Sequence, residues 1–466
     1  MARGESTNDS STSLPLLPSS SPLSTATPLS AVHPRRPTLF RLLVKLSLPA
    51  IVFTFISFLY LTFLSTDNSS LDPDQLRLKD WIHRNGSNVN VFDRLETTSY
   101  DGNAKAVFMA LGASLNEFHV RDRNGKMRDV VVGCRDPHAA LNETTYAYFG
   151  SVVGRYANRI SNSSFTDPLT NEVFHLPTNE GDRTTLHGGK WGYSRSGWRV
   201  EEHTRNQIVF SLHDEGTEGF PGTIKTRATY TLLSSPTRFR TVFESQVLSP
   251  SPLRTPISLS SHVYWNLDGY ESEEGKGVGG GMKVWIDADR TVQVDDDLIP
   301  TGELKAIEKG GPLDFASGRS GSEREIREAV QDERAKGLCG KDCAGLDNAL
   351  IYTDSRRDFE KDVVMSLASP SSGIRFKVRT NQPLVHLYSC NSPLFSSLSG
   401  DYPLKSSQNG GEFGTYGHQS CLAVEQEGWI DGLHHDKEWN LEREKSQWYD
   451  SEREYEWFSE YEFENF

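Results

Sequence analysis

Short segments of alternating apolar and polar residues recur along most of this 466-residue chain and limit it to few folds. Successive side chains of a β-strand point to opposite faces, so alternation marks strands with one face on a core. Gly, Pro, Asn and Asp, which favour turns, separate the segments. The clearest segments are 105–120, 128–133, 173–177, 207–213, 223–232, 239–248, 282–288, 374–380 and 383–390. Their number and spacing predict an all-β sandwich of many strands.

Three other segments carry distinct patterns. SEREIREAVQDERAK, residues 322–336, predicts a helix with Ser322 as its N-cap and Glu325 at the capping-box spacing. EEGKGVGGG, residues 273–281, lacks both the Lys-Ser/Thr ending of a phosphate loop and an adjoining βαβ unit, so we expect a flexible insertion and no nucleotide site. Between Tyr455 and Phe463 aromatic residues alternate with glutamates, which favours a final edge strand over a solvated acidic tail.

The first 66 residues differ from the rest. Residues 1–45 are rich in Ser, Thr and Pro and are predicted to be a disordered tail. Residues 46–66, LSLPAIVFTFISFLYLTFLST, carry no charge and are long enough for a transmembrane helix. Four basic residues precede this span and acidic residues follow it, which places the N-terminus in the cytosol. A cleaved signal peptide is the alternative, but the leader is long and no A-x-A site follows.

The remainder is then expected on the lumenal or extracellular side, as in a single-pass type II membrane protein with a signal anchor. We expect a polar stem over residues 67–90 and a single domain over residues 91–466. Four sequons that are compatible with N-glycosylation in a secretory lumen lie on this side: Asn68, Asn85, Asn142 and Asn162.

Charge and cysteine content restrict the partners. Lys and Arg number 49 against 63 Asp and Glu, and this net charge of -14 argues against a nucleic-acid partner, which is bound through basic patches. The five cysteines are an odd set and too dispersed for a disulfide scaffold. Cys339 and Cys343 could form a bridge in an oxidising lumen, at least one thiol should stay free, and no metal site is indicated.

Two residues are candidates for acid–base chemistry. The strand-like stretch TPISLSSHVYWNLDG contains His262, whose imidazole can act as an acid or base near neutral pH if it lies in a cleft. A purely structural histidine is the alternative. Glu425 follows the apolar residues CLAV, where partial burial would raise its basicity. A carboxylate base opposite an imidazole acid can move protons in both directions across a bound ring, without a metal or cofactor.

Other polar residues could bind a ligand. Asn158 and Arg159 adjoin in GRYANRI, and the guanidinium suits sugar hydroxyls or a carboxylate, although a surface ion pair is the simpler interpretation. His187 precedes two glycines in LHGGKWGYSRSGW, which would equally fit a tight turn with a solvent-facing histidine. Asp347 stands at the start of a predicted strand. Its carboxylate could accept hydrogen bonds from ligand hydroxyls, or it could simply be a turn residue.

Several motifs follow one another along the chain: GRYANRI, LHGG, DEGTEGFPG with TYTL, TPISLSSHVYWNLDG, LIPTGEL followed by PLDF, GLDNAL, QPLVHLYSCN and E-x-E-x-W-I-D. In this order they resemble the galactose mutarotase (aldose 1-epimerase) family from about Val91 to the C-terminus. The resemblance implies a β-supersandwich with an open sugar-binding cleft. It also implies interconversion of the α and β anomers of hexopyranoses such as galactose and glucose.

The resemblance assigns roles to individual residues. It implies that His262 is the general acid, although Ser261 stands where Asn is usual, and that Glu425 is the general base. The positions that match substrate-binding residues of the family are Asn158, Arg159, His187, Tyr264 and Asp347.

The chain also departs from the family pattern. His386 and Glu427 each stand where Gln is usual, and Ile430 replaces Pro, so hydroxyl recognition is expected to differ from that of galactose enzymes. Two further functions fit the same pattern: a carbohydrate-binding protein without turnover, and an enzyme for phosphorylated or oligomeric sugars. The second of these would be expected to place more basic residues around the cleft.

Overall fold

The computed structural model describes residues 88–138, 147–317, 322–353, 357–392, 395, 402–408, 414–441 and 446–466. The predicted tail, the predicted anchor and the sequons at Asn68, Asn85 and Asn142 lie outside these residues. None of the helices within the described ranges is long and apolar enough to cross a membrane. The fourth sequon, Asn162, is exposed at the turn between β6 (Arg159–Ser161) and β7 (Ser164–Thr166).

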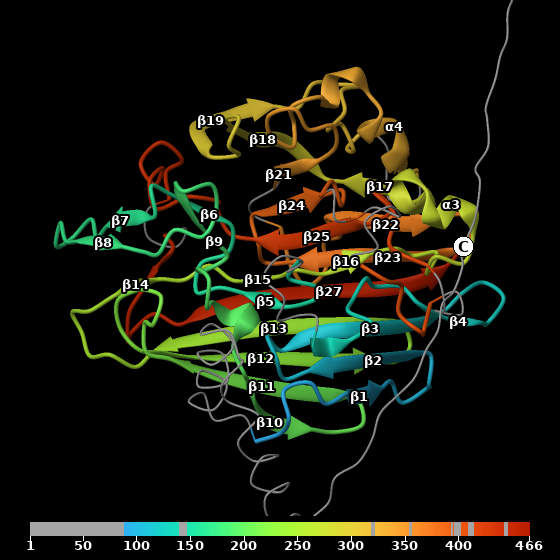
Figure 1. Cartoon of the computed structure of the whole chain (residues 1–466), viewed down its shortest axis with the longest axis horizontal. Helices are drawn as coiled ribbons and strands as arrows, with labels where there is room; N and C mark the ends of the chain where they lie inside the picture. The colour runs from blue at the N-terminus through green and yellow to red at the C-terminus, as the bar shows by residue number, and fades with distance from the viewer. Residues whose placement is uncertain are drawn as a thin grey trace, which may run out of the picture. The chain divides into compact units, whose positions relative to one another are not determined.

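The prediction of a mostly β fold is confirmed, and its largest element is a nine-stranded antiparallel sheet (Figure 1). Long strands such as β12 bury every second residue, as the alternation predicted. The strands lie in the order β10 (Arg199–His203), β11 (Gln207–Asp214), β12 (Ile224–Leu233), β13 (Thr237–Val247), β27 (Tyr455–Asn465), β23 (Ile374–Thr380), β22 (Met365–Ser369), β17 (Lys283–Ile286) and β20 (Arg324–Glu325).

Two further antiparallel sheets accompany it. The six-stranded sheet has the order β16 (Tyr264–Trp265), β25 (Leu422–Glu427), β24 (Leu384–Tyr388), β21 (Asp347–Tyr352), β18 (Ala288–Val294) and β19 (Pro300–Ala306). It is labelled from β19 at the top to β16 near the centre of Figure 1. The four-stranded sheet consists of β1 (Leu95–Thr98), β2 (Ala104–Met109), β3 (Ser114–Arg121) and β4 (Met127–Asp129).

Aromatic side chains join the three sheets in one core. Trp265 on β16 packs with its ring centroid 4.9 Å from that of Phe376 on β23. Phe118 on β3 lies 6.0 Å from Trp265 and stacks on Phe463 of β27 at 5.1 Å. Each of these large side chains is buried, which provides much of the apolar burial that stabilises a fold of this kind. The six-stranded and four-stranded sheets therefore both pack on the nine-stranded sheet.

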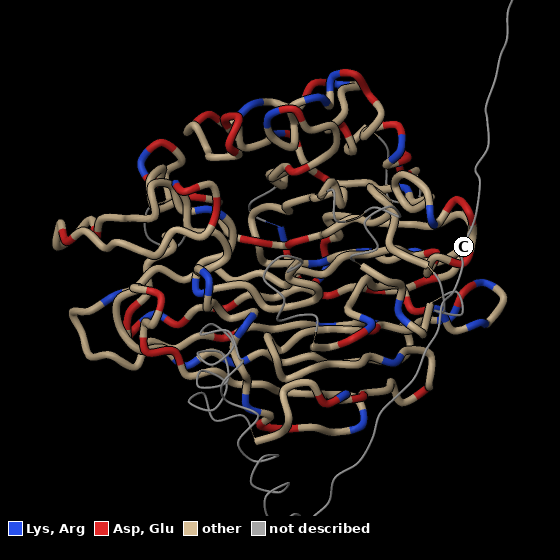
Figure 2. Tube along the Cα trace, viewed as in Figure 1, with Lys and Arg blue, Asp and Glu red and all other residues tan. Residues whose placement is uncertain are grey.

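The C-terminal strand was predicted correctly as a strand but wrongly as an edge. β27 lies in the middle of the large sheet, paired with β13 on one side and β23 on the other. Its glutamates meet cations from the neighbouring strands; Glu460 contacts Arg240 at 2.8 Å and Arg238 at 3.4 Å. Figure 2 shows the resulting interspersion of acidic and basic residues over the traced strands. Cross-strand ion pairs therefore allow a glutamate-rich strand to occupy an interior position.

The predicted helix over 322–336 is wrong in extent. Arg324 and Glu325 instead form β20, which pairs with β17, and only Ile326–Val330 form an α-helix, α4. The N-cap is Glu325, and the side chain of Glu323 contacts Arg375 of β23 at 2.7 Å. These contacts with the large sheet replace the predicted first turn, because tertiary pairing overrides local helix propensity.

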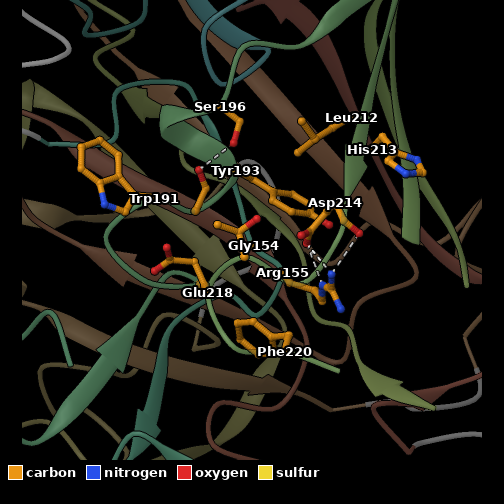
Figure 3. Close-up of a pocket in the computed structure, with 13 residues that line it drawn as sticks. Gly154, Arg155, Trp191, Tyr193, Ser196, Leu212, His213, Asp214, Glu218 and Phe220 are labelled. Carbon is orange, nitrogen blue, oxygen red and sulfur yellow. Dashed lines mark hydrogen bonds and ion pairs between the residues drawn. The ribbon is translucent and has the colours of Figure 1, made fainter. Parts of the chain in front are cut away.

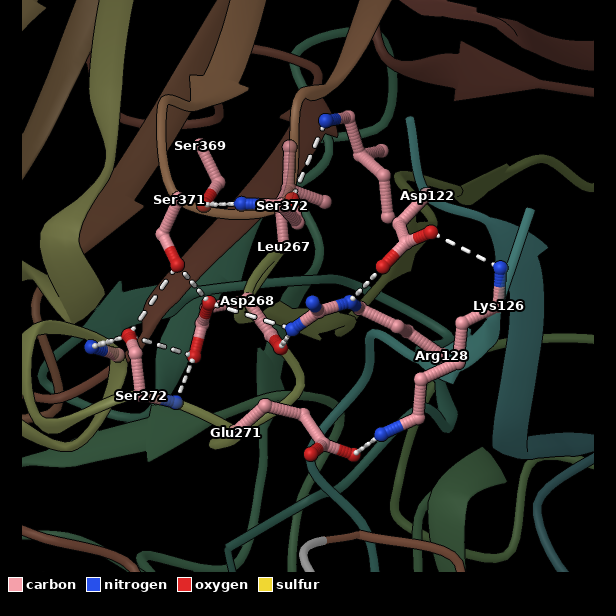
Figure 4. Close-up of polar contacts among 12 residues, drawn as sticks. Asp122, Lys126, Arg128, Leu267, Asp268, Glu271, Ser272, Ser369, Ser371 and Ser372 are labelled. Carbon is pink, nitrogen blue, oxygen red and sulfur yellow. Dashed lines mark hydrogen bonds and ion pairs between the residues drawn. The ribbon is translucent and has the colours of Figure 1, made fainter. Parts of the chain in front are cut away.

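The glycine-rich segment is structured, contrary to the prediction of a flexible insertion. It forms α3 (Glu273–Lys276) and a 3-10 turn over Val278–Gly281, with Gly275, Gly279 and Gly280 buried. Figure 4 shows how its start is anchored: Asp268 accepts hydrogen bonds from the backbone N–H and the hydroxyl of Ser272. Arg128 of β4 donates to the backbone oxygen of Asp268 at 2.8 Å, so this segment is tied to the four-stranded sheet.

Four of the five cysteines form disulfides. Cys339 pairs with Cys343, the pair that the sequence left open, and Cys390 pairs with Cys421, which the spacing did not suggest. Cys134 is free, as the odd number requires. The Cys390–Cys421 bridge joins the residues that follow β24 and precede β25, so it links two strands of the six-stranded sheet at one end.

Candidate active site

His262 and Glu425 come together although 163 positions separate them in the chain. His262 lies between β15 (Ser260–Ser261) and β16, and Glu425 lies on β25, which pairs directly with β16. This pairing brings His262 Nε2 to 3.4 Å from Glu425 Oε1. Both residues are largely buried, at 5% and 2% exposure. The two candidate acid–base groups thus face each other, as a shared site requires.

Burial sets the protonation of His262. Removal from water disfavours the imidazolium and lowers the pKa of His262 to about 3. The ring stacks against Tyr148 and meets the edge of His187, with centroids 5.6 and 5.1 Å away. Its Nδ1 atom is buried and has no hydrogen-bond partner among the described residues. The imidazole is therefore neutral and has one ring nitrogen free for a ligand.

Glu425 is shifted in the opposite direction. Burial raises its pKa well above the ordinary value, and the nearby carboxylates of Glu427 and Asp347 raise it further. Its Oε2 atom is buried without a hydrogen-bond partner in the described part of the chain. Buried polar atoms are rarely left unsatisfied, so this atom and His262 Nδ1 mark a place where a polar ligand would be bound.

His187 and Asn158 are held by each other. The backbone N–H of His187 donates to the Asn158 carbonyl, and the Asn158 N–H donates to His187 Nδ1, both at 3.1 Å. Nδ1 is thus an acceptor, which leaves the hydrogen on Nε2. His187 is buried, and this burial lowers its pKa well below the ordinary value, an effect that His262 increases. The alternative of a solvent-facing histidine is wrong.

Arg159 begins β6, which pairs with β9 (Thr184–Leu186) just before His187. It forms an ion pair with Glu180 at 2.8 Å, but its side chain is only 10% exposed, so this is not the surface pair that the simpler interpretation assumed. Burial opposes the charge of Arg159, yet Glu180 and Asp347 outweigh this and raise its pKa. Arg159 therefore remains a cation beside the site.

Asp347 and Tyr264 occupy different positions around the pair. Asp347 is the first residue of β21, and its Oδ1 lies 2.5 Å from His386 Nε2. Burial opposes ionisation of Asp347, but the bond from His386 outweighs it and the pKa is lowered. Tyr264 packs its ring 4.9 Å from that of His262, while its hydroxyl donates to the Ala147 carbonyl. Tyr264 therefore supports the His262 ring and has its hydroxyl already engaged.

His386 and Glu427 also belong to this cluster, although the sequence marked them only as unusual residues. His386 lies opposite Glu425 on the neighbouring strand β24, and Glu427 lies two residues beyond Glu425 on β25. The Asn158 side-chain amide donates to Glu427 Oε1 at 3.1 Å. Residues i and i+2 of a strand share a face, so the motif E-x-E was a signal that could have identified Glu427. No sequence motif pointed to Tyr148, which stacks on His262, or to Glu180, which pairs with Arg159.

Some of these side chains could also hold a metal ion. The donor atoms of His187, His262 and Glu425 lie within 4.8 Å of one another. Two histidines and one glutamate are also the residue types that bind zinc in three-residue sites. A second group, Glu117, His119 and Asp129, is also close. Its carboxylates are already engaged, however, since Arg94 contacts Glu117 at 2.7 Å and Lys405 contacts Asp129 at 2.8 Å.

A separate small pocket lies behind the turn that carries His187 (Figure 3). Figure 3 shows Arg155 joined to Asp214, while Glu218 lines the same pocket without a contact to Arg155 being drawn. Burial raises the pKa of Glu218 to about 7. Gly189 has a φ of +100°, which favours glycine, and a Cβ atom there would also lie 2.2 Å from Glu218 Oε2. The pocket supports the His187 turn and does not include the His262–Glu425 pair.

Comparison with known proteins gives a consistent family match. The family model described as aldose 1-epimerase matches residues 96–454. A probable aldose 1-epimerase of Arthroderma benhamiae is 36% identical over 360 residues, which cover 71% of this chain and 78% of that protein. Galactose mutarotase of Mus musculus is 30% identical over 322 residues, or 69% of this chain and 82% of that protein.

Solved structures give the same fold. An aldose epimerase homologue from C. elegans superposes with a TM-score of 0.65 at 24% identity, covering 80% of this chain and 99% of the homologue. Galactose 1-epimerase from Lactobacillus acidophilus gives a TM-score of 0.58 at 19% identity, with 79% and 93% coverage. At these identities the superpositions establish a common architecture.

Proposed function

The chain belongs to the aldose 1-epimerase family of isomerases, and on that premise we propose that it interconverts the α and β anomers of free hexoses such as galactose and glucose. The observation that carries the proposal is the His262–Glu425 pair. Its members lie 3.4 Å apart, and each retains a buried polar atom without a partner among the described residues. A pyranose would supply those partners through its anomeric hydroxyl and its ring oxygen.

The reaction needs one base and one acid. Glu425 removes the proton from the anomeric hydroxyl, the C1 carbonyl forms, and the C1–O5 bond breaks as His262 donates a proton to O5. Rotation about C1–C2 in the open-chain aldehyde presents the other carbonyl face. Closure with the proton roles reversed gives the opposite anomer. No electrons are gained or lost, and one proton enters the sugar for each that leaves.

The resting pair has the right number of protons for this cycle. The high pKa of Glu425 and the low pKa of His262 favour a carboxylic acid beside a neutral imidazole. Transfer of that single proton gives a carboxylate and an imidazolium, the forms in which Glu425 is the base and His262 the acid. The substrate has only to favour the second arrangement through its own hydrogen bonds.

Neighbouring residues would hold the sugar during rotation. His187 offers its Nε2 hydrogen, Arg159 a cation, and Asp347 a carboxylate with 16% of its side chain exposed. Their rigid strands and turns favour a defined orientation of the hydroxyls, which is the principal contribution of such residues to rate. Three acidic residues, Glu180, Asp347 and Glu427, offset the charge of Arg159, which favours neutral sugars over phosphorylated ones.

Polarimetry tests the proposal. The purified chain should accelerate the equilibration of α-glucose and α-galactose, and Glu425→Gln should abolish this because an amide cannot accept the proton. Glu456→Gln is the matched control, since Glu456 is exposed on β27 between the buried residues Tyr455 and Trp457, so its side chain points away from the core. Equal rates with and without the wild-type protein, together with measurable sugar binding, would instead favour a carbohydrate-binding protein.

The location of the enzyme is part of the same proposal. We place the domain in the secretory lumen or outside the cell, anchored by residues 46–66 in a type II orientation. Two disulfides and an exposed sequon at Asn162 support an oxidising, glycosylating compartment. An endoglycosidase should increase the gel mobility of the expressed chain, and Asn162→Gln should remove part of that shift. A domain that is digested when protease is added to intact microsomes would contradict the orientation.

A further inference from the structure

Glu427 lies beside the proposed base but has no part in the reaction described so far. It is two residues beyond Glu425 on β25, so both side chains point to the same face of the strand, with their Cα atoms roughly 6.6 Å apart. Glu427 is only 1% exposed. A carboxylate so deeply buried requires hydrogen-bond partners, since an unpaired one carries a large desolvation cost.

One oxygen of Glu427 is fixed by its neighbours. Oε1 accepts the Asn158 amide at 3.1 Å and lies 3.6 Å from His386 Nδ1. His386 is itself fixed at its other nitrogen by Asp347, at 2.5 Å. Three strands and one turn therefore hold the carboxyl group in a single orientation.

The other oxygen has no partner. Oε2 of Glu427 is buried and without a hydrogen bond among the described residues, as are Oε2 of Glu425 and Nδ1 of His262. The residues that carry these atoms are joined by close contacts, since His262 lies 3.4 Å from Glu425 and Glu425 neighbours Glu427 on its strand. A ligand that satisfies the first two atoms would thus extend towards the third.

We infer that Glu427 is a specificity-determining residue, whose free Oε2 accepts a hydrogen bond from one ring hydroxyl other than the anomeric one. The inference rests on the proposed function, because it assumes a pyranose placed between His262 and Glu425. A fixed carboxylate oxygen can only accept a hydrogen bond, so its partner must be a donor. On a pyranose, the donors within reach are the hydroxyls on the ring carbons near C1.

This arrangement makes the enzyme select against deoxy sugars. A hexose that lacks the hydroxyl in question leaves Oε2 buried and unpaired, which corresponds to a loss of about 5- to 150-fold in kcat/KM. The other deoxy sugars retain this bond and should be affected only through their own contacts. In Glu427→Ala the acceptor is gone, so the specific loss should disappear.

The experiment measures kcat/KM for glucose and for its 2-, 3-, 4- and 6-deoxy derivatives with wild type, Glu427→Ala, Glu427→Gln and the control Glu456→Gln. One deoxy sugar should be discriminated against by wild type and the control but not by Glu427→Ala. Glu427→Gln keeps the side-chain volume and an acceptor for Asn158, so it is the variant that folds if the alanine variant does not. It should reduce the same discrimination without abolishing it, because its amide would donate to the hydroxyl oxygen, and such a neutral hydrogen bond is weaker than one to a carboxylate.

Binding provides a second measurement without turnover. In a Glu425→Gln background, calorimetric Kd values for the same sugars should show the same coupling between position 427 and one hydroxyl. An equal effect of Glu427→Ala or Glu427→Gln on every sugar, in rate and in Kd, would overturn the inference and leave a merely structural residue. Failure of wild type to act on either glucose or galactose would instead refute the proposed function.

Discussion

The Cys390–Cys421 bridge permits a quantitative test of how the site is held. The two cysteines flank the strands β24 and β25, which carry His386 and Glu425, and both are fully buried. The perturbation is the double variant Cys390→Ser/Cys421→Ser. The comparison is Cys339→Ser/Cys343→Ser, which removes the other bridge and leaves this one in place.

The expected magnitudes follow from the chain that each bridge closes. Loop-closure entropy gives about 3.7 kcal/mol for a separation of 31 residues at 25 °C. The same expression gives about 1.9 kcal/mol for a separation of 4. Loop length alone thus accounts for a difference of about 1.8 kcal/mol, and the serines at the fully buried positions 390 and 421 would increase it through their desolvation.

Urea unfolding followed by tryptophan fluorescence measures both values, since eight of the nine tryptophans lie within residues 91–466. Removal of the Cys390–Cys421 bridge should lower the free energy of unfolding by more than removal of the other bridge, and it should increase the dependence on urea, because an unfolded chain without the cross-link exposes more surface. The reasoning is refuted if the Cys339–Cys343 variant is destabilised as much or more. A fall in kcat/KM at full folding would show that the bridge also positions β24 and β25.

Further predictions follow from the protonation and packing of the site. The pH profile of kcat/KM should be bell-shaped. Its acid limb should lie below the ordinary histidine pKa, because the imidazole of His262 becomes a cation only near pH 3. Its alkaline limb should lie above the ordinary glutamate pKa, because Glu425 retains its proton to a higher pH. An acid limb at pH 6.5 in a pH titration of the purified enzyme would contradict this. Gly188→Ala should reduce kcat at least about tenfold, because a Cβ atom there would lie 1.9 Å from the backbone oxygen of Gly154 and displace the neighbouring His187. Activity equal to that of the wild type in the same assay would contradict this prediction.

The strands were predictable because their pattern is local. Alternation in segments such as 223–232 and 239–248 reports directly on which side chains face the core, and these became β12 and β13. The position of a strand within a sheet is not a local property. Tyr455–Asn465 looked like an edge because it is rich in glutamate, and only the arginines of β13 and β23 explain why it is central.

Segments whose conformation depends on distant partners were predicted least well. The sequence 322–336 has a capping-box spacing, but Glu323 binds Arg375 and Glu325 pairs with β17. The glycines of 273–281 suggested flexibility, whereas their lack of side chains permits close packing: a Cβ on Gly275 would lie 2.0 Å from Asp268. In both cases the missing information was a contact that sequence spacing does not encode.

The sequence predicted which candidate residues lie close together better than it predicted their protonation. The resemblance of motifs selected His262, Glu425, Asn158, Arg159 and His187, and the strands bring these residues together. It did not reveal that Glu427 lies in the same buried cluster as Glu425 and Asp347. Protonation depends on burial and on the summed charge of neighbours, neither of which can be read from a motif.

The carboxylate of Glu427 affects the pKa of Glu425. Burial raises the pKa of Glu425, and the charges of Glu427 and Asp347 raise it further, which favours a protonated Glu425 that cannot accept a proton. A sugar hydroxyl that donates to Glu427 would draw its negative charge towards that bond and weaken this repulsion. Glu425 would then ionise more readily, with its proton passing to His262 across 3.4 Å. Substrate binding would thereby convert the neutral resting pair into the base and acid that ring opening requires, because the two forms differ only in the position of one proton.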